Sequence, residues 1–219
     1  LRIVYDKTYP PSTTDFTPIV RAIQATNPDV VAVCSYPLDS VGMVKAVNEL
    51  NYKPKMIGGA MVGLQATVFK RQLGPLLNGW VNYETWVPDK KMMYEGTEAF
   101  FAKYQSKAAA AGVDPLGYYL GGWGYAYIQV LGQAIAATKS LKDDALAEYI
   151  HKTTFKTIKG DIKFGANGEW AKSGMLQVQY HNIKQGAGLE TWRSMGHQKV
   201  LTPANLKTGD VVYPYEKAR

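Results

Sequence analysis

The sequence has 219 residues, of which 46% are hydrophobic and 20% are charged, so it is not a wholly disordered chain and can form one large or two small domains. No apolar run approaches the ~18 residues that would indicate a membrane-spanning helix. The net charge of +7 comes from basic residues that are scattered singly. Because they form no basic block interleaved with aromatic residues, we expect no nucleic-acid partner.

Cysteine usage excludes two further classes of protein. Cys34 is the only cysteine, so the chain has neither an intramolecular disulfide nor a cysteine-based zinc site.

The sequence begins with Leu1, and no charged segment followed by an apolar one and a cleavage site is present. We therefore expect any export signal to lie outside this sequence.

The first 90 residues alternate strand-like and helix-like patterns, which is typical of a parallel sheet covered by helices. Strands are predicted at Leu1–Tyr5, Val30–Cys34, Met56–Gly58 and Trp80–Val87. The helices between them are expected to follow Asp15, to be capped by Asp39 or Ser40, and to span about Leu64–Leu73. Because Val30–Cys34 is an unbroken apolar run, we expect this strand to be buried on both faces.

From Pro88 onward, long helical patterns follow one another, which places a domain boundary near this residue and predicts domains at 1–88 and 89–219. Helices are predicted at Met92–Ala111, Leu116–Thr138 and Leu141–Lys152, and strands at Asp161–Phe164 and Leu176–Tyr180. In the second helix Tyr125, Ile128 and Ile135 are expected to face inward. These helices have no buried parallel strands to cover, so part of their packing partner is expected to be missing.

Candidate binding residues follow the predicted strands, because ligands of open parallel sheets bind at the carboxyl ends of the strands. Their hydroxyl, aromatic and small side chains suit binding better than bond-making. Tyr36 could instead pack on the following helix, and Trp86 could be a core or hinge residue. The residues selected by this rule are Ser35, Tyr36, Pro37, Ala60, Met61 and Trp86.

A second cluster, Tyr118–Tyr125, combines aromatic residues and glycines at the start of a predicted helix. Glycine is unfavourable inside helices, so this density indicates a close approach of another group to the backbone. Tyr119 and Trp123 share one helix face, and Gly122 lies between them. Tight helix–helix packing is the alternative interpretation.

Catalytic patterns are weak. His151, His181 and His197 are far apart and lack the spacing of a metal site, and no Gly-x-Ser-x-Gly motif occurs. Cys34 ends a predicted buried strand, where a thiol behaves as a small hydrophobic group. We therefore expect no enzyme activity, no metal and no cofactor.

Several short segments, in this order, resemble the periplasmic substrate-binding proteins of branched-chain amino acid type ABC importers. They are Thr14-Asp15-Phe16, Asn27–Val31, Gly58-Gly59, Phe100–Tyr104, Ala134-Ile135, Gly160–Phe164 and Asn167-Gly168. The resemblance implies an incomplete type I α/β fold: a parallel-sheet second lobe with covering helices, and the C-terminal helical and β portion of the first lobe. An additional N-terminal part of family members has no counterpart here.

The resemblance also implies site residues. Tyr36 lies where the family places an aromatic residue over the ligand, and Tyr119, Gly122 and Trp123 lie near the helix start bordering the cleft. Amino acid binders usually carry an acidic residue after the Gly-Gly strand to hold the ligand ammonium, but this position is Ala60, followed by Met61. An unpaired ammonium in a dry cleft is costly, so aromatic or aliphatic carboxylates are favoured over simple amino acids.

The function that this resemblance implies is periplasmic capture of a small carboxylate, an aromatic acid or a branched-chain or aliphatic amino acid, between two lobes. Delivery to an ABC permease in the inner membrane would follow. The alternative is a ligand-sensing domain of a receptor or regulator with the same fold. The missing N-terminal portion, or another chain, is expected to cover an apolar flank.

Overall fold

A computed structural model describes residues 1–219 and divides the chain into two compact units. Unit 1 comprises residues 1–84 and 176–219, and unit 2 comprises residues 85–175. The expected boundary near Pro88 thus lies between residues 84 and 85. The C-terminal strands belong to unit 1. The sequence predicts residues 89–219 as a segment that returns to the first lobe, with its C-terminal strands at or near the hinge. None of the helices is long and apolar enough to cross a membrane.

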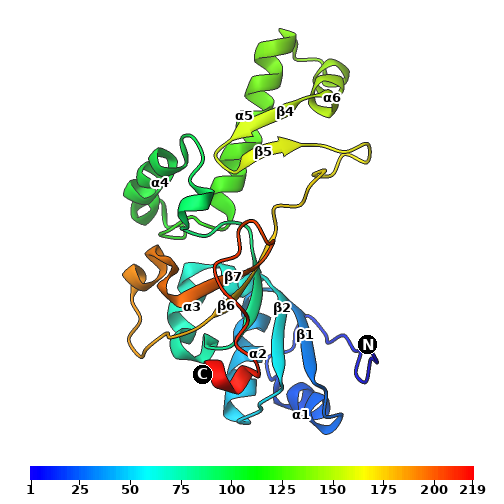
Figure 1. The fold of residues 1–219 in the computed structure, drawn as a ribbon, viewed down its shortest axis with the longest axis vertical. Coiled ribbons are helices and arrows are strands. Elements are labelled where there is room, and N and C mark those ends of the chain that lie inside the picture. Colours follow the sequence, from blue (N-terminus) through cyan, green and yellow to red (C-terminus); the bar gives the residue numbers. More distant parts are fainter. The chain divides into compact units, whose positions relative to one another are not determined.

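Unit 1 is built on a five-stranded sheet with the order β1-β2-β3-β6-β7 (Figure 1). The first three strands are parallel, and β6 and β7 are antiparallel to their neighbours. The strands are β1 (Val30–Ser35), β2 (Met56–Met61), β3 (Val81–Glu84), β6 (Leu176–Tyr180) and β7 (Gln198–Thr202). The parallel sheet predicted for the first part of the chain is confirmed, while β7 had no counterpart among the predicted strands.

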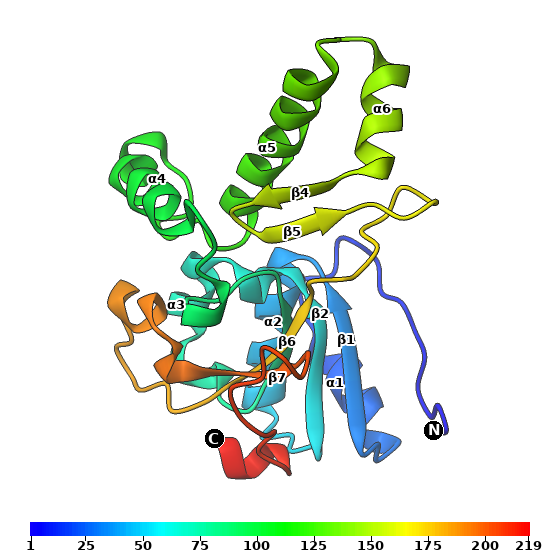
Figure 2. The same cartoon turned by 45° about the horizontal axis from the view of Figure 1, so that its top comes forward.

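Three helices lie on one face of this sheet (Figure 2). They are α1 (Thr17–Ala25), α2 (Pro37–Glu49) and α3 (Thr67–Leu73). Asp15 accepts a hydrogen bond from the Thr17 amide at 2.8 Å, as expected for a residue at a helix start. Helix α2 begins with Pro37 directly after Tyr36, rather than at Asp39 or Ser40, because proline fits the first helical position.

Two predictions for strands in the first 35 residues are wrong. Leu1–Tyr5 forms no strand, and Leu1 and Ile3 are exposed, because no neighbouring strand is present to pair with them. Strand β1 is buried on one face only: Val31 and Val33 are buried, whereas Val30 and Cys34 are exposed. Cys34 is therefore not a buried hydrophobic residue.

Unit 2 combines helices α4 (Thr97–Ala111), α5 (Leu120–Thr138) and α6 (Asp143–Lys152) with a two-stranded sheet. The sheet pairs β4 (Thr154–Thr157) with β5 (Gly160–Lys163) in antiparallel register. Two core clusters of unit 2 lie around Phe155 and around Ile158, where α5 and the hairpin meet, and the first also includes Leu146 of α6. The second cluster also contacts Phe100 of α4 and Trp170.

Helix α5 leaves one apolar face uncovered. Tyr125 and Ile128, which were expected to face inward, are exposed, and so are Leu120 and Tyr127. The helix carries no charged residue along its whole length. Its opposite face supplies Ala126, Val130 and Ala134 to the core. The apolar pattern of α5 therefore exceeds what the elements of unit 2 bury.

Candidate functional site

The carboxyl edge of unit 1, defined here as Ser35-Tyr36 after β1 and Ala60-Met61 at the end of β2, brings together four of the predicted binding residues. Ser35 lies opposite Met61, and Cys34 opposite Ala60, in the parallel register. Tyr36 is 75% exposed, and its backbone is extended immediately before α2. The exposed phenol of Tyr36 therefore stands at the position where a parallel sheet binds its ligands.

Ser40 organises this edge, although the sequence identified it only as a helix cap. Its hydroxyl donates to the Tyr36 carbonyl at 2.9 Å and accepts from the Gly63 amide at 3.1 Å. It also lies 2.8 Å from the Ser35 hydroxyl. Since the single Ser40 hydrogen is used toward Tyr36, Ser35 is the donor in this pair. Ser40 thus joins the end of β1, the start of α2 and the segment after β2.

The segment after β2 lies unusually close to Pro37. A Cβ atom added at Gly63 would come within 2.5 Å of the Pro37 carbonyl oxygen, so no larger residue fits there without a shift. Pro37, the fifth residue predicted at this edge, therefore contacts the loop through its backbone. Its ring also sets the first turn of α2.

Asn82 holds the end of β2 from the neighbouring strand β3. Its side-chain oxygen accepts from the Met61 amide at 2.9 Å, and its side-chain nitrogen donates to the Met61 carbonyl at 3.0 Å. The Asn82 side chain thus takes the place of a strand partner for both the amide and the carbonyl of Met61. The Met61 side chain is fully buried, while Ala60 is exposed. Of these two predicted residues, only Ala60 presents its side chain to solvent.

A buried polar cluster lies deeper in unit 1. Lys70 of α3 and Glu84 of β3 form an ion pair at 2.6 Å, and both side chains are less than 10% exposed. The Tyr180 hydroxyl donates to Glu84 at 3.1 Å and lies 2.9 Å from the Leu64 carbonyl. Burial raises the pKa of Glu84, while Lys70 and the hydrogen bonds oppose this rise. The cluster fixes the last residue of β3 relative to α3.

Tyr9 also reaches this part of unit 1. Its hydroxyl donates to Asp39 in the first turn of α2 at 3.4 Å, and its ring packs edge-on against Phe16. Partial burial, together with the Asp39 carboxylate, raises the pKa of Tyr9 to about 12. Tyr9 therefore stays a neutral donor at physiological pH. It links the chain before α1 to the start of α2.

The remaining predicted residues lie in unit 2. Trp86 is buried in an aromatic cluster, with ring centroids 4.5 Å from Phe101 and 4.7 Å from Tyr118, and its indole nitrogen donates to the Met92 carbonyl at 3.0 Å. Trp86 thus has the contacts of a core residue.

Two of the predicted residues at the start of α5 lie beside a buried lysine. Tyr119 precedes α5, and Gly122 and Trp123 lie in its first turn. The Lys159 ammonium lies 4.8 Å from the centre of the Trp123 ring and donates to the Thr85 carbonyl at 2.9 Å. A Cβ atom added at Gly122 would lie 3.3 Å from the Lys159 side chain. Lys159 is thus a buried cation beside Gly122 and Trp123, an arrangement that no local sequence pattern indicates.

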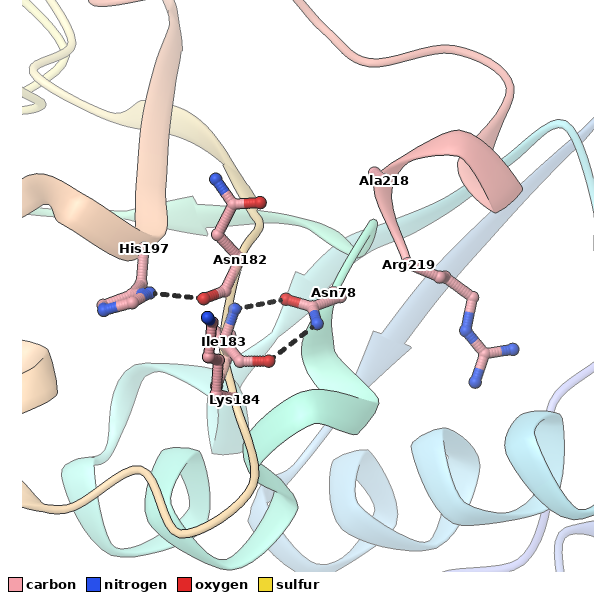
Figure 3. A pocket seen from close by; sticks show the side chains of 7 residues that line it. All are labelled: Asn78, Asn182, Ile183, Lys184, His197, Ala218 and Arg219. Carbon is pink, nitrogen blue, oxygen red and sulfur yellow. Dashed lines mark hydrogen bonds between the residues drawn. The ribbon is translucent and has the colours of Figure 1, made fainter.

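An open pocket of about 600 Å³ lies elsewhere in unit 1, where Asn78, Ile183 and His197 meet (Figure 3). The Asn78 side chain accepts from the Ile183 amide at 2.9 Å and donates to the Ile183 carbonyl at 3.0 Å. His197 contacts the Asn182 carbonyl. The residues that line the pocket include none from the carboxyl edge. Asn78 lies just before β3, and His197 lies just before β7.

Most of the sequence matches a known family. A family model described as "Periplasmic binding protein" matches residues 1–187. The Leu/Ile/Val-binding protein homolog 8 of Brucella abortus is 26% identical over 194 residues, which cover 84% of this chain and 46% of the relative. The chain therefore spans about half the length of the curated relatives it matches.

Solved structures have the same fold. A leucine-binding protein from Thermotoga maritima aligns with a TM-score of 0.66 at 23% identity, covering 82% of this chain and 48% of that one. A solute-binding protein of an ABC transporter from R. palustris, in complex with benzoate, aligns with a TM-score of 0.68 at 18% identity, covering 95% and 52%. Together with the family match over most of its length, this fold shows that the chain belongs to the periplasmic binding protein family.

Proposed function

We propose that this chain forms part of a periplasmic solute-binding protein that captures a small carboxylate and delivers it to an ABC permease. The observation that carries the proposal is the carboxyl edge of unit 1, where the phenol of Tyr36 is exposed and the Tyr36 backbone is held by the Ser35–Ser40–Gly63 network. An exposed aromatic ring on a hydrogen-bonded backbone beside a helix start suits the binding of a small acid, because it offers a flat apolar face and a hydrogen-bond donor.

Within this class, we propose an aromatic or aliphatic acid without an ammonium group. Ala60 presents only a methyl group at the carboxyl edge. An ammonium bound there would need a carboxylate, since an unpaired charge in a dry site is costly. The relatives named above bind leucine in one case and benzoate in another, so both ligand classes belong in the test. For unit 2, we propose that Tyr119 and Trp123 add ligand contacts.

The ligand class is tested by calorimetry on the protein at the full length of its relatives. Benzoate, 4-hydroxybenzoate, leucine and valine form the panel. Heat with the aromatic acids and none with the amino acids is expected. Tight binding of leucine with no response to benzoate would contradict the absence of an ammonium partner, and no response to any of the four would contradict the capture of an aromatic acid or a branched-chain amino acid.

Tyr36→Ala is expected to weaken binding of the responding acid about tenfold, because it removes the aromatic face from the carboxyl edge. Tyr36→Phe keeps this face and separates the role of the ring from that of the hydroxyl. Tyr213→Ala is the matched control, since Tyr213 is also an exposed tyrosine of unit 1 but lies outside the carboxyl edge. Equal affinities for Tyr36→Ala and Tyr213→Ala would exclude Tyr36 from the site.

We further propose that the uncovered face of α5 packs against the part of the longer protein that this chain does not span. Ile128→Glu is then expected to change the stability of the 219-residue chain by less than about 0.5 kcal/mol, because Ile128 is exposed there. In the longer protein the same change is expected to cost more than about 2 kcal/mol, because it buries a charge. Urea unfolding of both lengths gives these values, and equal effects would contradict the proposal.

A further inference from the structure

The pocket around Asn78, called the Asn78 pocket from here on, has a fixed floor. Asn78 is buried, and its side-chain amide bonds both backbone groups of Ile183, as Figure 3 shows. These paired bonds hold the segment after β6 against the residues before β3, which are distant along the chain. Ile183 is itself buried, so its neighbours Asn182 and Lys184 are placed at the pocket by a firm support.

His197 forms a wall of the pocket in a fixed orientation. Its Nδ1 lies 3.0 Å from the Asn182 carbonyl, and because a carbonyl oxygen only accepts, Nδ1 carries the hydrogen. The ring also packs against Trp192, with 6.5 Å between the ring centres. The side-chain amide of Asn182 makes no hydrogen bond within the chain, so its N–H groups can donate to a bound molecule.

The titratable side chains that line the pocket are all basic. They belong to Lys184, His197 and Arg219, and no aspartate or glutamate lines the pocket. Lys184 is exposed and forms no ion pair. Because no carboxylate offsets the charge of Lys184, the pocket attracts anions.

Arg219 adds a second positive charge at the rim. Its guanidinium donates to Asn48 of α2 at 2.6 Å and is directed away from Asn78 (Figure 3). Glu216 is the acidic group near Arg219, and it is paired with Lys53 at 2.6 Å. The charge of Arg219 is therefore held in place without a carboxylate partner of its own.

Positive charge continues behind His197. Burial lowers the pKa of His181, and the charges of Lys199 and His197 lower it further. The His181 amide donates to the His197 carbonyl at 3.0 Å, so the two residues lie side by side. The positive potential is thus not confined to the residues that line the pocket.

The Asn78 pocket lies at the opposite end of the sheet from the carboxyl edge. Asn78 precedes β3, which is parallel to β2, so it lies at the amino ends of these strands. Strand β7 also begins there, because it is antiparallel to β6, which is antiparallel to β3. A molecule in the pocket therefore does not compete with a ligand at the carboxyl edge.

We propose that the Asn78 pocket binds the phosphate group of a small organic molecule. Two positive charges, on Lys184 and Arg219, favour a doubly charged oxyanion over a single carboxylate. The Asn182 amide adds a neutral donor, and Ile183 and Ala218 add an apolar wall for the organic part. The volume of about 600 Å³ is that of a small-molecule site.

Calorimetric titration of the longer protein with inorganic phosphate, phenyl phosphate and acetate tests this proposal. Phenyl phosphate is expected to bind about fivefold more tightly than inorganic phosphate, because its ring contacts the apolar wall. Acetate is expected to bind about tenfold more weakly than inorganic phosphate, because it carries one charge. No heat from either phosphate, or equal affinities for acetate and inorganic phosphate, would overturn the proposal.

Lys184→Gln is expected to weaken binding of phenyl phosphate about tenfold, because it removes a charge-assisted hydrogen bond. Arg21→Gln is the matched control: Arg21 is an exposed basic residue of unit 1, but it lies on α1 and does not line the pocket. This control is expected to leave the affinity unchanged. Equal losses in both variants would indicate attraction to the basic surface in general and would overturn the proposal.

The two sites of unit 1 are tested separately. Tyr36→Ala is expected to leave binding of phenyl phosphate unchanged, and Lys184→Gln is expected to leave binding of the carboxylate ligand unchanged. Loss of phenyl phosphate binding in Tyr36→Ala would place the phosphate at the carboxyl edge and overturn the proposal. Binding to phosphatidylglycerol vesicles without a response to either soluble phosphate would also overturn it, in favour of a lipid headgroup.

Discussion

Lys70→Met is expected to destabilise unit 1 by about 3–5 kcal/mol, because it leaves the carboxylate of Glu84 buried without its cation. Methionine keeps most of the length of lysine, so the loss reports on charge rather than on packing. The ring contacts that Lys70 makes with Tyr180 and Trp192 lie within 6 Å of its ammonium and are lost as well. Urea unfolding followed by circular dichroism measures the change.

Two further variants separate the contribution of the ion pair to stability from the effect of replacing a lysine in general. Lys70→Met combined with Glu84→Leu is expected to recover most of the lost stability, since it removes both buried charges together. Lys152→Met breaks the exposed pair with Glu148 and is expected to cost less than about 0.5 kcal/mol. A Lys70→Met effect as small as that of Lys152→Met would show that the buried pair contributes little.

The pH dependence of stability gives an independent check of the Lys70–Glu84 pair. Burial raises the pKa of Glu84 in the folded state, and removal of Lys70 takes away the main force that opposes this rise. The folded variant then binds more protons than the unfolded chain as the pH rises above about 4.5. Its stability therefore falls as the pH increases. The destabilisation caused by Lys70→Met is expected to be small at pH 4.5 and large at pH 7.

The sequence predicts those parts of the fold that local patterns determine. Val30–Cys34, the helix after Pro37 and the Asn167-Gly168 turn each carry their signal within a few residues, and the structure contains them. Strands β4 and β7 were missed because they are short and alternate with polar residues. Strand β7 also depends on pairing with β6, which is distant along the chain.

Errors about burial have a common physical cause. Periodicity shows that Ile128 and Cys34 belong to apolar surfaces, but it cannot show whether another element covers those surfaces. Both side chains are exposed because α5 and β1 each lack a neighbour on one side. Leu1–Tyr5 fails as a strand for the same reason, since a strand needs a partner to form.

For the candidate site, the rule for parallel sheets led to Ser35 and Tyr36 at the carboxyl edge. It could not identify Ser40 or Asn82 as supports, because their hydrogen bonds join segments about 20 residues apart. A serine in the first turn of a helix is too common to signal such a contact. The supporting residues emerge only when the strands are placed side by side.

Gly58→Ala is expected to cost more than about 3 kcal/mol, with a decrease in Tm of roughly 6–12 °C. A Cβ atom at this position would lie 1.7 Å from the Val81 carbonyl oxygen, where β2 pairs with β3. The obstacle is backbone rather than a flexible side chain, so the two strands would have to separate. The φ of +151° adds strain for any residue with a side chain.

The matched control for this prediction is Gly168→Ala. Gly168 also has a positive φ, but a Cβ atom there would meet nothing within 4 Å. Only conformational strain of about 1–2 kcal/mol is then expected. The difference between the two variants isolates the effect of forcing β2 and β3 apart. Because Gly58 precedes the Ala60-Met61 end of β2, calorimetric titration of the longer Gly58→Ala protein should also show weaker ligand binding if the carboxyl edge forms the site. Equal destabilisation by both variants would mean that the contact between the strands is not what requires glycine at this position.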